Sequence, residues 1–125
     1  MTTKKQKIVA IDDTKFICDT LEAWLKSSYD ITTFTKGEQG LKYLLENEDV
    51  ALVLLDYDMP EMTGYEVLMS IRSNQKINKI PVIFLTAVEN ERMENEMLER
   101  GANDYIRKPL DIIVLRSHIE KLLGS

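Results

Sequence analysis

Short apolar runs alternate along the chain with longer segments that place apolar residues at helical spacing. Five runs are expected to be strands, at 8–11, 29–34, 50–56, 82–85 and 104–106. Those at 8–11, 50–56 and 82–85 are almost continuously apolar, which is typical of strands buried on both faces of a parallel sheet. The run at 29–34 alternates and contains β-branched and aromatic residues, so we expect it near a sheet edge.

Each apolar run is followed by a segment with the periodicity of an amphipathic helix. The apolar positions that share a helical face lie at 17–25, 41–45, 67–71, 93–98 and 112–122. Thr14 and Asp111 precede the first and last of these segments and are expected to cap the helices. Five β-α units joined by short loops predict an α/β fold, a doubly wound five-stranded parallel sheet with five helices.

The fourth of these helices is strongly charged. Between Glu89 and Arg100 its apolar stripe consists of Met93, Met97 and Leu98 alone. Because a surface helix is held mainly by the apolar face that it buries, we expect this helix to be the least securely packed element.

Composition narrows the class of protein. The 125 residues, 44% of them hydrophobic, suffice for one compact domain spanning 1–125. A net charge of −5 disfavours direct nucleic-acid binding and suits cationic partners or a divalent metal. The single cysteine, Cys18, excludes an internal disulfide and is expected to be buried. No apolar stretch reaches the ~18 residues of a membrane span, so we expect a cytoplasmic protein without membrane contact.

Polar side chains follow the predicted strands. Asp12 and Asp13 come after the first strand, Asp56 ends the third, Thr86 follows the fourth, and Lys108 follows the fifth. Right-handed crossovers place the carboxyl ends of parallel strands on one edge of the sheet, where ligands bind in such folds. These five side chains are therefore expected to converge.

Three carboxylates in one crevice repel one another unless a cation joins them. Mg²⁺ suits such a site because it prefers carboxylate and water oxygens, and Mn²⁺ is an alternative. The pair Asp12 and Asp13 alone would more often be a solvated turn or a helix cap. Their combination with Asp56 and Lys108 favours a metal site.

Asp56 is the best candidate nucleophile, since a carboxylate can accept a phosphoryl group as an aspartyl-phosphate. Lys108 would bind a phosphoryl oxygen, and the Thr86 hydroxyl would donate to another. Each alone reads as an ordinary surface lysine or strand threonine. The only histidine, His118, is expected to be solvated on the last helix.

The motifs at these strand ends resemble the CheY-like receiver domain of two-component response regulators, over essentially the whole chain. They are Asp12-Asp13, Asp56 in Leu54-Leu-Asp-Tyr-Asp-Met-Pro60-x-x-x-Gly64, Thr86-Ala87, and Lys108-Pro109. The resemblance implies a flavodoxin-like (βα)5 fold with strand order 2-1-3-4-5. It also implies that Asp56 receives a phosphoryl group from a sensor histidine kinase or a histidine phosphotransfer protein.

The same resemblance assigns roles to further residues. It implies that Mg²⁺ is held by Asp12, Asp13, Asp56 and the backbone carbonyl of Asp58. Thr86 and Tyr105 match the switch pair of the family, in which the hydroxyl moves toward the phosphoryl group and the aromatic ring turns inward. Lys108 and Pro109 match the lysine and its usually cis proline.

The surface formed by residues 89–122 would then change on phosphorylation and be read by a downstream protein, with a phosphorylation-linked dimer left open. The resemblance implies a single receiver domain without an output domain. It also implies a signalling switch rather than an enzyme, beyond self-phosphorylation and autodephosphorylation.

Three positions near the site depart from the commonest family pattern. Tyr57 is larger than is usual after the nucleophile, Asp58 adds a negative side chain, and Val88 is apolar. Such flanking positions tune the lifetime of the phosphoryl group in the family, so the lifetime is left open here.

Two alternative functions start from the same residues. A haloacid-dehalogenase-type phosphatase could use Asp56-Tyr57-Asp58 as its Asp-x-Asp motif. It is disfavoured because the acidic pair follows the first strand and no cap insertion is present. A receiver-like interaction module that is not phosphorylated is disfavoured by the presence of Asp56, Thr86 and Lys108.

Overall fold

Strands and helices alternate strictly in the computed structural model, which describes residues 4–87 and 89–124. The strands are β1 (Lys7–Ile11), β2 (Asp30–Phe34), β3 (Val50–Asp56), β4 (Val82–Thr86) and β5 (Asp104–Arg107). The helices are α1 (Lys15–Leu25), α2 (Gly37–Glu46), α3 (Gly64–Ser73), α4 (Glu91–Glu99) and α5 (Ile112–Leu123). No helix within these described ranges is long and apolar enough to span a membrane.

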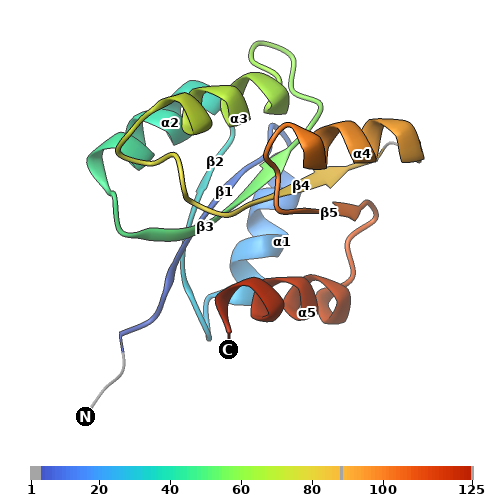
Figure 1. Cartoon of the computed structure of the whole chain (residues 1–125). Coiled ribbons are helices and arrows are strands. Elements are labelled where there is room, and N and C mark those ends of the chain that lie inside the picture. The colour runs from blue at the N-terminus through green and yellow to red at the C-terminus, as the bar shows by residue number, and fades with distance from the viewer. Residues whose placement is uncertain (1–3, 88, 125) are drawn as a thin grey trace.

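All five strands belong to one parallel sheet in the order β2-β1-β3-β4-β5 (Figure 1). This confirms the predicted fold class and strand order. The alternating segment at 29–34 forms β2 at a sheet edge, as its pattern predicted. The nearly continuous apolar runs form β1, β3 and β4 in the centre of the sheet.

Helices cover both faces of the sheet, with α2, α3 and α4 on one side and α1 and α5 on the other (Figure 1). Successive strand residues point to opposite faces, so Val53 and Leu55 join the α2–α4 core while Leu52 and Leu54 join the α1–α5 core. Burial on both faces explains why β3 carries hardly any polar residue before Asp56.

The connection from β3 to α3 is tight. The Gly64 N–H donates to the carbonyl of Tyr57 at 3.0 Å. A Cβ at Gly64 would lie 2.3 Å from the carbonyl oxygen of Asp56, so only glycine permits this approach. Thr63 and Glu66 then form a reciprocal capping box that begins α3. The close approach at Gly64 and the capping box thereby fix the loop that follows Asp56 in the chain.

The two predicted N-caps have different outcomes. The Asp111 carboxylate accepts hydrogen bonds from the backbone N–H groups of Ile113 and Val114, as expected. Thr14 precedes α1, but its side chain makes no capping hydrogen bond. Its backbone N–H instead donates to the Asp12 carboxylate at 2.9 Å. The Asp12 side chain, just after β1, therefore also holds the backbone at the start of α1.

Two other expectations about helices were wrong in part. On α4, Leu98 is 39% exposed, whereas Glu94 is only 1% exposed and takes its place in the interior. On α5, His118 is half-buried and hydrogen-bonds the Asp104 carboxylate, so it is not simply solvated. In both cases the helix side chain binds a residue of β5, Arg107 for Glu94 and Asp104 for His118. The sequence of the helix alone does not show these partners.

Candidate functional site

The carboxyl ends of the strands bring the predicted site residues together. Asp56 ends β3 and Thr86 ends β4, and both are buried. Asp12 follows β1 directly and is fully buried, while Asp13 is exposed beside it. Lys108 follows β5 and is mostly buried. The site therefore has a buried floor and one exposed carboxylate at its edge.

The Lys108 side chain reaches across the sheet edge to two carboxylates. Its ammonium donates to Asp12 Oδ2 at 2.9 Å and to Asp56 Oδ1 at 3.2 Å. Its backbone N–H donates to the carbonyl of Thr86 at 2.8 Å, which fixes the chain beside the end of β4. The peptide bond between Lys108 and Pro109 is cis. One cation therefore faces two buried anions that come from distant parts of the sequence.

Burial and neighbouring charges alter the ionisation of this cluster. Burial, followed by the charge of Asp12 and a hydrogen bond with Asp13, raises the pKa of Asp56 to about 7, against the opposing effect of Lys108. For Lys108, burial works against the charged form, but hydrogen bonds and charge from Asp12 and Asp56 outweigh it and raise the pKa. The pocket thus holds more negative charge than Lys108 alone compensates.

The same three carboxylates fit a divalent cation. One oxygen from each of Asp12, Asp13 and Asp56 lies within 4.8 Å of the others. A hard oxygen donor set with excess negative charge is what Mg²⁺ selects, and a bound cation would relieve the repulsion. Asp58, whose carbonyl is a further candidate ligand, is exposed in the loop after Asp56.

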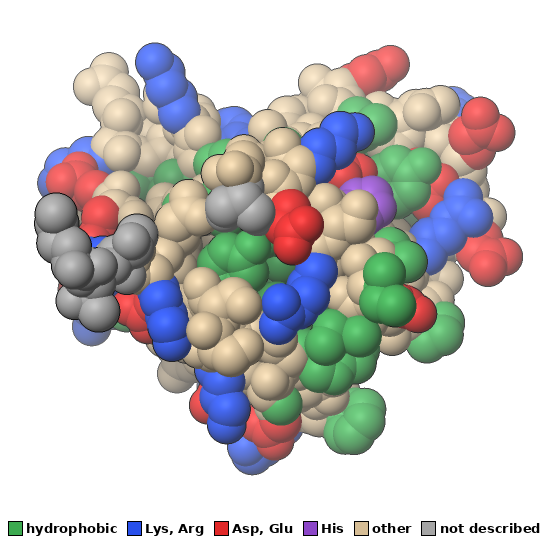
Figure 2. All heavy atoms as spheres, turned by 90° about the horizontal axis from the view of Figure 1, so that it is seen from below, with side chains coloured by type: hydrophobic (Ala, Val, Ile, Leu, Met, Phe, Trp, Pro, Cys, Tyr) green, Lys and Arg blue, Asp and Glu red, His purple; other side chains and the backbone are tan. Residues whose placement is uncertain are grey.

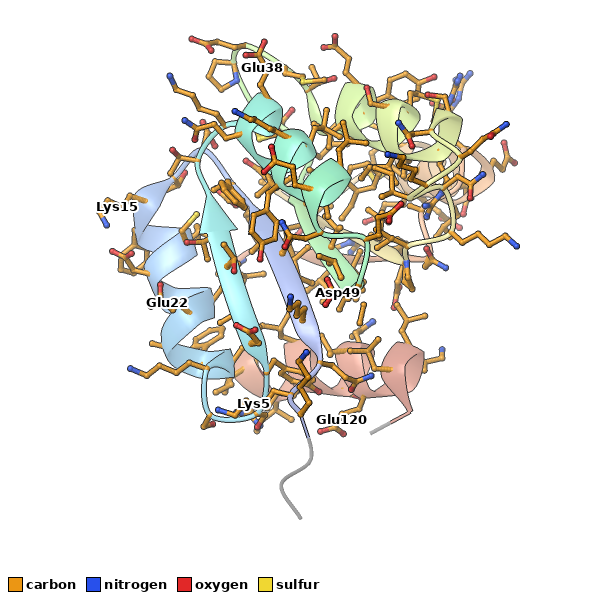
Figure 3. All side chains as sticks on the ribbon, turned by 90° about the vertical axis from the view of Figure 1, so that its left-hand side faces the viewer. Lys5, Lys15, Glu22, Glu38, Asp49 and Glu120 are labelled. Atoms are coloured by element: carbon orange, nitrogen blue, oxygen red, sulfur yellow. The ribbon has the colours of Figure 1, made fainter. Side chains whose placement is uncertain are left out.

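A cavity of about 260 Å³ opens beside Asp13, between the loop that begins α2 and the loop after β3. Glu38 borders it and lies at the opposite end of the molecule from Lys5 and Glu120, which sit near the two chain termini (Figure 3). The site is therefore open to approach from the end at which α2 begins.

The candidate switch pair sits on neighbouring strands. Thr86 is buried at the end of β4, and Tyr105 on β5 is half-buried against the core on the α2–α4 side. Burial and the charge of Glu94 on α4 raise the pKa of Tyr105, and the Glu94 carboxylate binds Arg107 at 2.8 Å. Glu94 is not predictable from the sequence, because nothing in a charged helix distinguishes the one carboxylate that faces inward. Val88, whose apolar side chain was expected to affect the lifetime of the phosphoryl group, lies outside the described residues.

The residue after Asp56 connects the site to the interior. The Tyr57 ring packs edge-on against Phe84 of β4, with ring centroids 5.5 Å apart. Burial raises the pKa of Tyr57, with a further contribution from the charge of Asp58. A large aromatic residue at this position therefore fills space between β3 and β4 rather than crowding the carboxylates.

Comparisons with known proteins indicate one protein family. A family model described as the response regulator receiver domain matches residues 8–120. The chain is 32% identical to the two-component response regulator ORR5 of Oryza sativa subsp. japonica over 82% of this chain and 78% of that protein. It is also 38% identical to a probable cyclic di-GMP phosphodiesterase of Vibrio cholerae. That alignment covers 94% of this chain and 26% of the relative.

A solved structure of similar fold contains a bound metal ion. It is the receiver domain of a sensor histidine kinase from Pseudomonas aeruginosa PAO1, crystallised with a magnesium ion in its active-site cleft. The TM-score is 0.85 with 28% identity, over 97% of this chain and 99% of that one.

Proposed function

This chain belongs to the response regulator receiver domain family, and on that premise we propose that it accepts a phosphoryl group on Asp56 from a phosphohistidine protein. The observation that carries the proposal is the position of Lys108, whose ammonium bridges Asp12 and Asp56. A lysine held among carboxylates at a sheet edge is suited to receive an anionic group that one of those carboxylates has taken up.

In the proposed transfer, a carboxylate oxygen of Asp56 attacks the phosphorus atom of a phosphohistidine. A P–O bond forms to Asp56, the P–N bond breaks, and the electron pair returns to the imidazole nitrogen. Lys108 exchanges its contact with Asp56 for a phosphoryl oxygen, and the Thr86 hydroxyl donates to a second one. Mg²⁺, held by Asp12, Asp13, Asp56 and the Asp58 carbonyl, would neutralise the charge gathered there; Mn²⁺ could replace it.

Phosphorylation would then bias a conformational change through Thr86 and Tyr105. As Thr86 turns toward the phosphoryl group it leaves space on the α4 side, into which the Tyr105 ring moves. The surface of α4, β5 and α5 changes with it and is read by a downstream protein. A few kcal/mol of difference in phosphoryl contacts between two states suffices for a large change in their populations.

The surroundings of the site favour a protein as the phosphodonor. Hydrophobic side chains gather toward one side of the face that carries α5 (Figure 2). The exposed large hydrophobic residues at the starts of α1 and α5 are Phe16 (74%), Ile113 (77%) and Val114 (44%). Both helices begin just after a strand that contributes to the site, so a helical phosphodonor domain could cover them while presenting its histidine.

In this function the chain is a signalling switch rather than an enzyme with turnover on a separate substrate. Residues 1–125 would act as a single receiver domain in the cytoplasm, where a sensor histidine kinase or phosphotransfer protein would present the phosphohistidine. The net charge of −5 supports an output through protein contacts rather than through nucleic acid. A dimer formed on phosphorylation through the α4, β5 and α5 surface would be one form of that output.

The test is incubation of the chain with Mg²⁺ and acetyl phosphate, followed by intact-mass measurement. We expect one added phosphoryl group that is stable in acid and labile in base, and none in the Asp56→Asn variant. Asp19→Asn, which changes an exposed carboxylate on α1, is the matched control and should behave like the wild type. An unchanged mass of the wild-type chain would refute the proposal.

A further inference from the structure

The cavity beside Asp13 consists mostly of residues that the proposed phosphoryl transfer does not use. It measures about 260 Å³ and lies between the loop that begins α2 and the loop after β3. Asp13 is the one member of the carboxylate cluster that borders it. The cavity is therefore a second feature of the same edge of the sheet, next to the place where a phosphodonor would approach.

Apolar side chains from the loop after β3 form one wall of the cavity. Met59 and Met62 both border it, and Met59 is only 7% exposed while Met62 packs against the core on the α2–α4 side. Pro60 lies between them in the chain and is exposed. Unbranched methionine side chains adapt to the shape of the group that they contact. This wall suits an aliphatic or flat group.

The charged side chains around the cavity are mainly acidic. Asp13, Glu38 and Glu61 contribute three carboxylates, against the single ammonium of Lys36. Glu38 and Glu61 are exposed, and neither forms an ion pair with any residue that the structure describes. They come from different walls, Glu38 from the start of α2 and Glu61 from the loop after β3. The cavity thus combines an apolar wall with an excess of negative charge.

An arginine side chain has the matching chemistry. Its methylene stem and planar guanidinium can lie on methionine and proline, while the guanidinium N–H groups donate to carboxylates on two sides. A lysine ammonium is a compact, strongly hydrated point charge and would use the apolar wall less well. The volume also favours a single side chain, because sites for whole small molecules usually measure roughly 300–1,000 Å³.

We propose that this cavity receives an arginine side chain of the phosphodonor protein and so places that protein over Asp56. This role rests on the proposed function, because it names a feature of the protein that delivers the phosphoryl group. A donor that covers the carboxyl edge of the sheet lies across the cavity as well, since Asp13 belongs to both. The net charge of −5 adds a general attraction for a cationic partner surface.

The first test measures binding of N-acetyl-arginine amide, with N-acetyl-citrulline amide as its neutral counterpart and N-acetyl-lysine amide as the alternative cation. The methyl groups of Met59 and Met62 serve as NMR probes in the cavity, with Met97 on α4 as the internal reference. Excess Mg²⁺ is present, so that a cation among the site carboxylates is not mistaken for one in the cavity. The arginine compound should shift both methyl signals saturably, and the other two should bind at least about threefold more weakly.

Charge substitutions around the cavity should change this affinity in opposite directions. Glu38→Gln and Glu61→Gln should each raise the dissociation constant of the arginine compound about two- to fivefold, whereas Lys36→Gln should lower it by a similar factor. Glu46→Gln, an exposed position at the far end of α2, is the matched control and should match the wild type. If Glu38 and Glu61 served only the stability of their own segments, all variants would bind the compound equally, which would overturn this role of the cavity.

The second test measures phosphoryl transfer from a phosphorylated histidine phosphotransfer domain that acts on the wild type. The double variant Glu38→Gln/Glu61→Gln should accept the phosphoryl group about five- to tenfold more slowly, while its phosphorylation by acetyl phosphate should not slow. The wild-type transfer rate should also fall more steeply with added salt than that of the double variant. Equal transfer rates with equal salt dependence would mean that no cationic side chain of the donor enters the cavity.

The outcomes distinguish this role from the proposed function. If the wild-type chain takes up no phosphoryl group, the proposed function fails and the cavity has no donor to receive. If the chain is phosphorylated but the arginine compound leaves the Met59 and Met62 signals unchanged, only the role of the cavity is overturned. Equally tight binding of the citrulline compound, or tighter binding of the lysine compound, would also overturn it, because the recognised group would then not be a guanidinium.

Discussion

The Lys108 ammonium lies 3.2 Å from Asp56 Oδ1, although 51 residues of sequence separate the two positions. The strands that precede them are not neighbours, since β4 lies between β3 and β5 in the sheet. Lys108 spans that gap because its backbone is tied to the carbonyl of Thr86 at the end of β4. The contact therefore depends on the register of three strands at once.

Replacing Lys108 by alanine should separate metal binding from phosphorylation. Lys108 donates no ligand to a cation, so Mg²⁺ binding should persist or strengthen once the competing ammonium is gone. Phosphorylation by acetyl phosphate should fall at least about tenfold, because the phosphoryl oxygen loses its cationic partner. Loss of Mg²⁺ binding, measured by titration calorimetry, would mean that the lysine has another role.

The same variant should also reveal the cost of the uncompensated carboxylates. Without Lys108 the pKa of Asp56 should rise further, so at neutral pH a buried carboxyl must take up a proton or stay unpaired, and the metal-free domain should lose about 1–3 kcal/mol of unfolding free energy. Added Mg²⁺ should restore much of the loss by binding the folded state. Lys121→Ala, at an exposed position on α5, should change neither urea unfolding nor its Mg²⁺ dependence.

Gly64→Ala should disturb the site through the backbone. The new methyl group would lie 2.3 Å from the carbonyl oxygen of Asp56 and 2.8 Å from Cα of Tyr57, neither of which can turn aside. We expect a loss of about 2–3 kcal/mol in unfolding free energy together with impaired phosphorylation. In Gly37→Ala the nearest atom, at 2.9 Å, is in the Val67 side chain, so urea unfolding should shift less. Equal effects of the two changes would contradict this explanation.

Periodicity was sufficient to predict the fold and the residues gathered at the sheet edge. Continuous apolar runs marked β1, β3 and β4, and the polar residues that ended them were brought together because parallel strands share one carboxyl edge. The pattern failed where a side chain is satisfied by a partner far along the chain. Glu94 looked like one of many surface charges on α4, and His118 looked unpartnered.

Arg72 shows the same limit of sequence reasoning. It sits on α3, and its guanidinium donates to the carbonyls of Gly101, Asn78 and Ile80 and to the side chain of Asn103. Burial lowers its pKa. Nothing in the local sequence indicates this role, because the acceptors lie on two loops that meet only in the folded chain.

Arg72→Met should therefore destabilise the domain without touching the site. The variant keeps most of the aliphatic length but leaves several part-buried carbonyls without their donor, so we expect a loss of about 2–3 kcal/mol. Arg72→Lys should recover only part of it, because an ammonium cannot reproduce the planar fork. Arg92→Met, at an exposed position on α4, should be nearly neutral in urea unfolding. Full recovery by lysine would contradict the argument from geometry.

Exposed apolar residues near the site should affect a protein phosphodonor but not a small one. Phe16→Ser and Ile113→Ser should leave stability and phosphorylation by acetyl phosphate unchanged, because both side chains are mostly in solvent. Transfer from a phosphorylated histidine phosphotransfer domain that acts on the wild type should slow by about five- to tenfold. Leu45→Ser, an exposed apolar position on α2, is the control. Equal transfer rates for all variants would place the donor elsewhere.

The contact between Glu94 and Arg107 should appear in the acid dependence of stability. The hydrogen bonds from Arg107, its charge and the Tyr105 hydroxyl together outweigh burial and lower the pKa of Glu94. A carboxylate whose pKa is lowered on folding stabilises the protein above its unfolded-state pKa, and that contribution is lost as the pH falls through its folded-state value. Arg107 and Tyr105 are the charged and titratable groups that contact it, and neither titrates in this range.

Urea unfolding between about pH 6 and pH 3 should therefore show a shallower loss of stability in Glu94→Gln than in the wild type. The two curves should converge at the acid end, where Glu94 is protonated and no longer differs in charge from glutamine. Glu99→Gln should keep the wild-type slope, because that side chain is exposed. Parallel curves for the wild type and Glu94→Gln would mean that the carboxylate of Glu94 is not stabilised by β5 in solution. The attachment of α4 would then have to come from Met97 and its apolar neighbours instead.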